Sequence, residues 1–195
     1  MLIYLHGFNS SPGSHKAQVL RHYMQEHRLD DQYCCPALPH EPRRAIAVIE
    51  AKIARYPRDS ITLVGSSLGG FYATYLAERH DLCAVLINPA VCPHEDLRAY
   101  LGVQHNLHTQ QQYQLTEDHL RQWEKLYLPT VRSRRYLLLV ETGDEVLDYR
   151  DAVKKYEGAR QIIIDGGDHS LKSFPEHIPL ILDFAGLAYN SKLPR

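Results

Sequence analysis

Residues 61–70 read Ile-Thr-Leu-Val-Gly-Ser-Ser-Leu-Gly-Gly, a short apolar run that leads directly into a Gly-x-Ser-x-Gly turn. The run is typical of a buried strand, and residues 69–79 have the pattern of a helix. A chain that turns sharply from strand to helix exposes the side chain at the apex, Ser67, and crowds the positions two residues away, where glycine stands. The pattern therefore predicts a nucleophilic serine, the alternative being a glycine-rich turn that only packs a helix on a sheet.

Short apolar runs alternate with amphipathic segments along most of the chain. This alternation predicts an α/β fold, an open and mainly parallel sheet with helices on both faces, in which sites lie at the carboxyl ends of the strands. Strands are expected at residues 2–5, 33–36, 61–64, 83–87, 136–141 and 161–164, and helices from residue 14 and at residues 42–55, 69–79, 149–156 and 175–184.

The loops after the last two expected strands carry the groups that a serine nucleophile needs. A serine hydroxyl requires a base, and the base requires an orienting group. Asp144 follows the strand at 136–141 and His169 follows the strand at 161–164, in the order serine, acid, histidine. Asp148 and Glu145 are alternative acids, although Asp148 has the position of a helix N-cap. A turn-forming aspartate and a solvated loop histidine are the plain structural alternatives for Asp144 and His169.

The loop after the first strand, His6-Gly7-Phe8-Asn9, is expected to complete an oxyanion hole. One donor would be the N–H of Leu68 at the helix N-terminus, and the other the N–H of Phe8, since Gly7 allows close approach of the backbone. His6 is a possible second base, but we expect it to shape the loop through hydrogen bonds.

Residues 91–129 break the alternation and are expected to form one or two helices outside the sheet, as a small helical cap within a single domain of residues 1–195. A helix expected at residues 117–127 has an apolar face that could roof an acyl pocket or pack on the sheet as ordinary core: Leu120, Trp123, Leu126 and Tyr127. His105 and His108 have a spacing found in metal sites, but no third ligand follows, so we predict no metal.

Composition narrows the classes of partner. Lys plus Arg total 22 and Asp plus Glu total 23, a formal net charge of −1. Nucleic acids and anionic membranes both call for a basic excess, so neither is expected as a partner. No apolar run reaches the roughly 18–20 residues of a membrane span. The four cysteines lack the spacing of a zinc site, and with no secretory signal they indicate a reducing cytoplasm.

Five segments together resemble the bacterial YqiA-type esterases, small members of the α/β-hydrolase superfamily. They are residues 5–12, 65–74, 88–91, 142–150 and 166–169, and the segment at 142–150 (Thr-Gly-Asp-Glu-Val-Leu-Asp-Tyr-Arg) is the most specific. The resemblance implies six strands in the order 2-1-3-4-5-6, without the first two antiparallel strands of larger relatives.

The same resemblance implies a serine esterase that needs no cofactor and acts on small acyl esters or thioesters. Carried over by position, it makes Ser67 the nucleophile, Asp144 the acid and His169 the base of a triad that forms an acyl-enzyme. The alternatives are an acyl-CoA thioesterase or an amide hydrolase with the same residues, or a non-catalytic binding module on the same fold.

Overall fold

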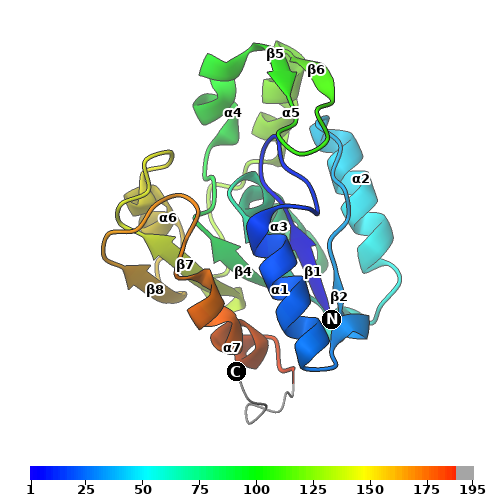
Figure 1. The fold of residues 1–195 in the computed structure, drawn as a ribbon. Helices are drawn as coiled ribbons and strands as arrows, with labels where there is room; N and C mark the ends of the chain where they lie inside the picture. The colour runs from blue at the N-terminus through cyan, green and yellow to red at the C-terminus, as the bar shows by residue number, and fades with distance from the viewer. Residues whose placement is uncertain (188–195) are drawn as a thin grey trace.

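Six strands form one parallel sheet at the centre of the molecule, shown in a computed structural model that describes residues 1–187 (Figure 1). The order is β2-β1-β3-β4-β7-β8, which is the order predicted for the six strands. The predicted fold class is confirmed. The domain boundary was placed at residue 195, and residues 188–195 lie outside the described part. The strands are β1 (Leu2–Leu5), β2 (Tyr33–Cys34), β3 (Thr62–Ser66), β4 (Cys83–Ile87), β7 (Tyr136–Glu141) and β8 (Arg160–Ile164).

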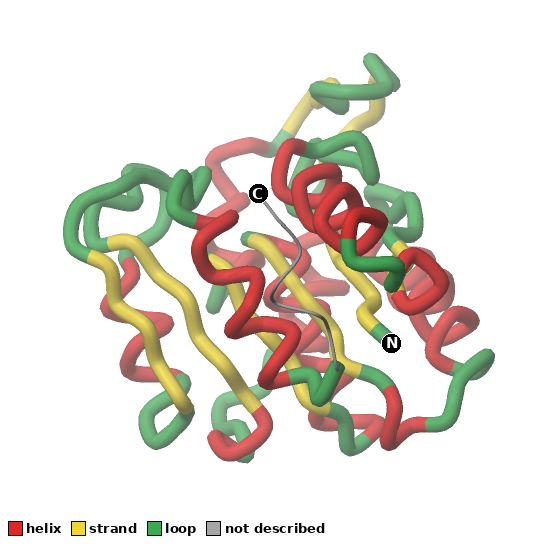
Figure 2. The backbone as a smooth tube through the Cα atoms, turned by 60° about the horizontal axis from the view of Figure 1, so that its bottom comes forward, coloured by secondary structure: helices red, strands yellow, loops and turns green. Residues whose placement is uncertain are grey.

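Helices cover both faces of this sheet, as Figure 2 shows. Alternate residues of a strand point to opposite faces, so each central strand supplies two cores. In β7, Leu137 and Leu139 pack with the helices α1 and α7, whereas Leu138 and Val140 pack with α2, α3 and α6. The bounds are α1 (His15–Glu26), α2 (Pro42–Ile53), α3 (Leu68–His80), α6 (Tyr149–Lys155) and α7 (Phe174–Phe184), with short 3-10 turns η1 (Asp30–Gln32), η2 (Arg58–Ser60) and η4 (Ser133–Arg135).

The cap segment, residues 91–129, lies beyond the carboxyl ends of the strands, at the top of Figure 1. Its elements are α4 (Pro93–Asp96), η3 (Leu97–Tyr100), β5 (Gly102–His105), β6 (Gln112–Leu115) and α5 (Glu117–Leu126). The prediction of helices alone was therefore incomplete, because β5 and β6 form an antiparallel hairpin. Both strands are polar and lie outside the core, so they lack the apolar alternation that reveals a half-buried strand.

Helix α5 anchors the cap to the body of the molecule. Trp123 is fully buried and its indole N–H donates to the hydroxyl of Tyr72 at 2.8 Å, while Leu120 is 2% exposed. The interpretation of Leu120 and Trp123 as a pocket roof is wrong, and their alternative interpretation as core residues is correct. No helix within residues 1–187 is long and apolar enough to cross a bilayer.

Candidate active site

Ser67 occupies a strained backbone position at the turn between β3 and α3. Its φ is 53° and its ψ is −122°, a conformation that non-glycine residues rarely adopt. The Ser67 N–H donates to the carbonyl of Ile87 at 3.0 Å, and the Ser67 carbonyl accepts from Gly70 and Ala90. Because α3 begins at Leu68, the Leu68 N–H is one of the amides that a helix leaves without an intrahelical partner.

The glycines that flank Ser67 are required by close packing. A Cβ on Gly69 would collide with the carbonyl of Leu5 in β1, and a Cβ on Gly65 would collide with the backbone of Gly69. The crowding predicted from the Gly-x-Ser-x-Gly pattern is therefore present. The turn holds Ser67 directly beside the end of β1, where the expected oxyanion loop begins.

His169 and Asp144 are brought together by the loops that follow β8 and β7. His169 Nδ1 lies 2.8 Å from Asp144 Oδ2. The Asp144 side chain is only 1% exposed, and its Oδ1 accepts the N–H groups of Val146 and Leu147. This carboxylate is thereby fixed in place, with one oxygen directed at the imidazole.

The two alternative acids have other partners. Asp148 caps α6 by accepting the N–H of Arg150, and its carboxylate pairs with the Arg150 guanidinium. Glu145 accepts the backbone N–H of His169 at 3.0 Å rather than its ring. The geometry therefore favours Asp144, and the predicted N-cap position of Asp148 is confirmed.

The electrostatics of Asp144 suit a group that stays ionised. Burial raises its pKa, but the hydrogen bond with His169 and those from the Leu147 and Val146 amides outweigh this effect. The pKa of Asp144 consequently lies below its ordinary value.

Asn88 and Glu141 support the histidine loop, and the sequence reasoning did not assign them a role. Asn88 Nδ2 donates to the carbonyls of Asp168 and His169, both at 3.2 Å, and Asn88 Oδ1 accepts the Glu141 N–H. The buried Glu141 carboxylate accepts the Asp168 N–H and the Ser173 hydroxyl. A polar residue at the end of an otherwise apolar strand is the signal that could have identified both.

Lys16 of α1 reaches the same loop from the side. Its ammonium donates to the Ser170 carbonyl at 2.7 Å and lies 3.5 Å from the His169 carbonyl. Burial is the main cause that lowers the pKa of Lys16 to about 8, against the opposing attraction of Asp144, Asp168 and other carboxylates. The histidine loop is therefore held by three elements, at the ends of β4 and β7 and by α1.

Ser67 and His169 are neighbours through Ile87 and Asn88. Ile87 accepts the Ser67 N–H, and Asn88, the next residue, donates to the His169 carbonyl. No hydrogen bond joins the side chains of Ser67 and His169 in the described chain. The end of β4 thus lies between the elbow, at the end of β3, and the acid–base pair, at the ends of β7 and β8, and the complete hydrogen-bonded triad that the sequence predicts is not formed.

The loop after β1 lies against the elbow. A Cβ on Gly7 would lie 3.3 Å from Ser67 Cβ, so the backbone that leads to Phe8 passes beside the serine. His6 is buried, its Nε2 accepts the Leu38 N–H at 3.0 Å and its Nδ1 lies 3.1 Å from the Gly7 carbonyl. Both ring nitrogens are therefore engaged, which matches the expectation that His6 shapes the loop.

Asn9 connects this loop to the cap hairpin. Asn9 has a φ of 51°, its Nδ2 donates to Gln104 of β5 at 3.0 Å, and its Oδ1 accepts the Tyr113 hydroxyl of β6 at 2.6 Å. The Leu107 N–H donates to the Asn9 carbonyl at 2.9 Å. The residue that follows Phe8 is thus held by both strands of the hairpin and by the turn between them.

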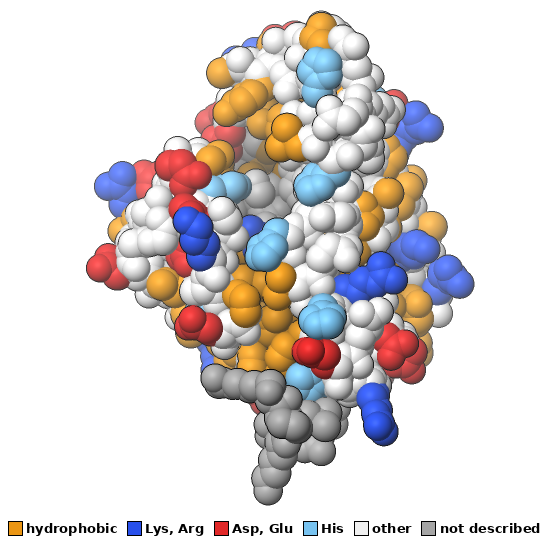
Figure 3. Space-filling view, in the orientation of Figure 1, with side chains coloured by type: hydrophobic (Ala, Val, Ile, Leu, Met, Phe, Trp, Pro, Cys, Tyr) orange, Lys and Arg blue, Asp and Glu red, His pale blue; other side chains and the backbone are white. Residues whose placement is uncertain are grey.

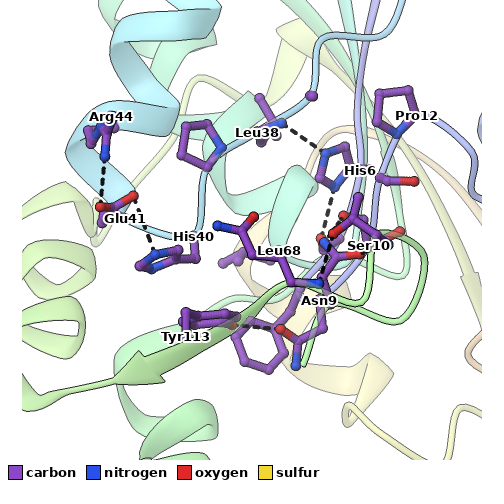
Figure 4. A pocket seen from close by; sticks show the side chains of 18 of the residues that line it. His6, Asn9, Ser10, Pro12, Leu38, His40, Glu41, Arg44, Leu68 and Tyr113 are labelled. Atoms are coloured by element: carbon purple, nitrogen blue, oxygen red, sulfur yellow. Dashed lines mark hydrogen bonds and ion pairs between the residues drawn. The ribbon is translucent and has the colours of Figure 1, made fainter. Parts of the chain in front are cut away.

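A pocket of about 370 Å³ opens beside this loop, between the cap hairpin and the segment that precedes α2. Figure 4 shows His6, Asn9, His40, Glu41 and Tyr113 arranged around it, and Figure 3 shows the surface hollowed below the cap. Residues of the loop after β1 and Leu68 line one end of the pocket, and charged or polar side chains line the other. The lining includes Gly7, Phe8, Leu68, His40, Glu41, Arg44, Thr109, Gln111 and Tyr113.

The described residues hold no group of three or more His, Cys, Asp or Glu side chains that could bind a metal ion. His105 belongs to β5 and His108 to the hairpin turn.

The fold is that of the α/β-hydrolases. Alpha/beta hydrolase domain-containing protein 10 from mouse aligns with a TM-score of 0.70 and 15% identity, covering 95% of this chain and 89% of that one. Est1E from Butyrivibrio proteoclasticus aligns with a TM-score of 0.64 and 14% identity, over 94% and 84% of the two chains.

Sequence comparison places the chain more narrowly. The model of the uncharacterised protein family UPF0227 matches residues 1–186, so the chain belongs to that family. A UPF0227 protein of Pectobacterium atrosepticum is 24% identical over 192 residues, which cover 96% of this chain and 99% of the relative. YcfP of Salmonella arizonae is 23% identical over 195 residues, with 96% and 99% coverage. The family resemblance predicted from the sequence is thereby confirmed.

Proposed function

We propose that this protein is a serine esterase that hydrolyses small acyl esters through an acyl-enzyme on Ser67. The observation that carries the proposal is the 2.8 Å contact between His169 and the buried Asp144 side chain, at the same edge of the sheet as the strained Ser67 turn. An imidazole oriented by a buried carboxylate, within reach of a serine on a strained turn, is the arrangement that can activate a hydroxyl for attack. The α/β-hydrolase fold, which the chain shares with the esterase domain of a Rhodothermus marinus protein, agrees with it.

In the proposed mechanism, the neutral His169 ring removes the Ser67 hydroxyl proton as Oγ attacks the ester carbonyl. Asp144 holds the imidazole through Nδ1 and stabilises its cation, so the proton is received at Nε2. The oxyanion accepts hydrogen bonds from the N–H groups of Phe8 and Leu68, and one such donor contributes about 2.7–4 kcal/mol. His169 then gives the proton to the leaving alcohol, which departs as the acyl-enzyme forms.

Water then hydrolyses the acyl-enzyme, with His169 acting first as base and then as acid. His169 takes a proton from water, the hydroxide attacks the acyl carbonyl, and the proton passes to Ser67 Oγ as the acid is released. Thioesters and amides would follow the same path, and their leaving groups differ only in how much they need the proton from His169.

A fluorophosphonate probe tests the proposal directly. The probe phosphonylates an activated serine, so mass spectrometry should find the adduct on Ser67, and Ser67→Ala should abolish both the adduct and ester hydrolysis. Ser66→Ala serves as the matched control and should retain labelling. Absence of labelling on a folded wild-type protein would favour the binding module instead.

Side-by-side assays of p-nitrophenyl esters, acyl-CoA thioesters and anilides then separate the three activities. The proposal expects the highest kcat/KM for an oxygen ester. A higher kcat/KM for acyl-CoA or anilide substrates would move the assignment to a thioesterase or an amide hydrolase with the same nucleophile.

A further inference from the structure

The pocket described above lies on the acyl side of the proposed reaction centre. Gly7, Phe8 and Leu68 line it, whereas Ser67, His169 and Asp144 do not. Gly7 connects the pocket to the serine, since a Cβ on Gly7 would lie 3.3 Å from Ser67 Cβ. In the tetrahedral intermediate the leaving oxygen must face His169 to receive its proton, and the oxyanion must face the Phe8 and Leu68 amides. The remaining substituent on that carbon, the acyl chain, is therefore directed into the pocket.

The far end of the pocket presents both hydrogen-bond donors and an acceptor (Figure 4). Glu41 accepts from Arg44 at 3.0 Å through Oε1, and its Oε2 lies 3.7 Å from His40 Nε2. The Glu41 carboxylate and the Arg44 guanidinium carry opposite charges, so the pair has no net charge. A group placed there meets a carboxylate oxygen, an imidazole and a guanidinium within one short wall.

A chain of hydrogen bonds orients the His40 ring. His119 Nδ1 accepts the backbone N–H of Thr116, so its proton is on Nε2, which lies 3.0 Å from His40 Nδ1. His40 Nδ1 is then the acceptor, and Nε2 carries the proton of its ring. The ring also stacks on Tyr113, with centroids 4.1 Å apart. His40 is thus held as an N–H donor.

The cap wall of the pocket is polar as well. Thr109, Gln111 and Tyr113 line it, whereas apolar residues such as Leu38 and Pro39 line the opposite segment. A hydrocarbon chain long enough to reach this wall would remove its polar groups from water without offering them hydrogen bonds, which costs free energy. At about 370 Å³ the pocket is also at the small end of the usual range of ligand sites.

We propose that the acyl pocket selects short acyl groups that carry a neutral hydroxyl, bound by Glu41, His40 and Arg44, over fatty acyl chains. This inference rests on the esterase function proposed above. A hydroxyl both donates and accepts, so it matches the carboxylate and the N–H donors together. A carboxylate or an ammonium on the acyl chain would match only one member of the Glu41–Arg44 pair and would oppose the other.

Two p-nitrophenyl esters of equal shape test the selection. In 3-hydroxybutanoate a hydroxyl stands where 3-methylbutanoate has a methyl, and rates divided by those of alkaline hydrolysis remove their different intrinsic reactivity. The corrected kcat/KM should be about tenfold higher for the hydroxy ester, and that for the octanoate ester should be lower than both. Equal or higher corrected values for the methyl, octanoate or hemisuccinate ester would overturn the inference.

Two variants test whether Glu41 causes the preference for the hydroxy ester. Glu41→Gln removes the charged acceptor and keeps the side-chain shape, and it should lower the hydroxy-to-methyl ratio at least about threefold. Arg43→Met, in the first turn of α2 that Glu41 precedes but outside the pocket lining, should leave the ratio unchanged. An unchanged ratio in Glu41→Gln contradicts the assignment of Glu41. Fluorophosphonate labelling of Ser67 is measured in parallel: intact labelling with no hydroxyl preference means that only this inference fails.

Discussion

The two halves of the candidate site are held in different ways. The acid–base half, Asp144 and His169, is fixed by groups at the ends of the central strands, by Asn88 and Glu141. The oxyanion half, Phe8 and its neighbours, is attached through Asn9 to the hairpin of the cap segment. Changes in the cap can therefore alter the oxyanion loop and the acyl pocket without disturbing the acid–base pair.

Replacement of Asp144, in the acid–base half of the site, should cause the largest loss of kcat. Asp144→Asn keeps the shape but cannot stabilise an imidazolium, so kcat should fall by roughly 10³–10⁴-fold. Asp148→Asn is the control, because asparagine caps a helix as well as aspartate does, and its kcat should stay within about threefold. The reverse ranking of the two variants would make Asp148 the acid.

Removal of Asn88 should be the next largest effect. Asn88→Ala leaves the carbonyls of Asp168 and His169 and the buried Glu141 N–H without the amide partner, so the free energy of unfolding should fall by about 2–3 kcal/mol. The histidine loop should loosen with it, and kcat should fall by at least about tenfold at a temperature where circular dichroism shows a folded protein. An unchanged kcat in the folded variant would remove Asn88 from the positioning network.

Removal of the Tyr113 hydroxyl in the cap should lower kcat less than the substitutions of Asp144 and Asn88. Tyr113→Phe removes the donor to Asn9 Oδ1 and keeps the ring that stacks on His40. With p-nitrophenyl acetate, whose acyl group is too small to fill the pocket, kcat should fall about three- to tenfold.

Inhibition by a trifluoromethyl ketone, which forms an oxyanion on Ser67, should weaken by the same factor in Tyr113→Phe. Tyr75→Phe is the control, since the Tyr75 hydroxyl accepts only from Arg79 at the surface. A loss in kcat without a loss in ketone affinity would show that the cap contact acts on something other than the oxyanion loop.

Acid should lower the free energy of unfolding gradually, through three buried or partly buried histidines near the cap. Burial lowers the pKa of His6, His40 and His119 below the ordinary 6.5, chiefly by desolvation of the charged form. The unfolded chain therefore binds more protons below about pH 6.5, and the free energy of unfolding should decrease as the pH falls through that value. Urea midpoints at pH 7.5 and 5.5 measure the decrease. His119→Gln should reduce it, whereas His22→Gln, at an exposed site, should not.

The strand positions and the Ser67 turn were predictable because they depend on local patterns, whereas the strand order followed from the family resemblance. The apolar run at residues 61–64 and its flanking glycines leave few alternatives to a buried strand followed by a tight turn. His169 and Asp144 were predictable for a related reason, since parallel strands bring successive loops to one edge. The hairpin at residues 102–115 was not, because its polar strands have no apolar face to reveal them.

By itself the amino-acid sequence determined the sheet, the elbow and which loops meet at its edge, because strand periodicity and glycine positions act over short distances. Only the tertiary structure decided that Asn9 is bound by the cap, that Asn88 and Glu141 hold the histidine loop, and that Glu41 and Tyr113 line one pocket. Those features join segments about 30 to 100 residues apart, and hydrogen bonds over such separations leave no periodic trace along the chain.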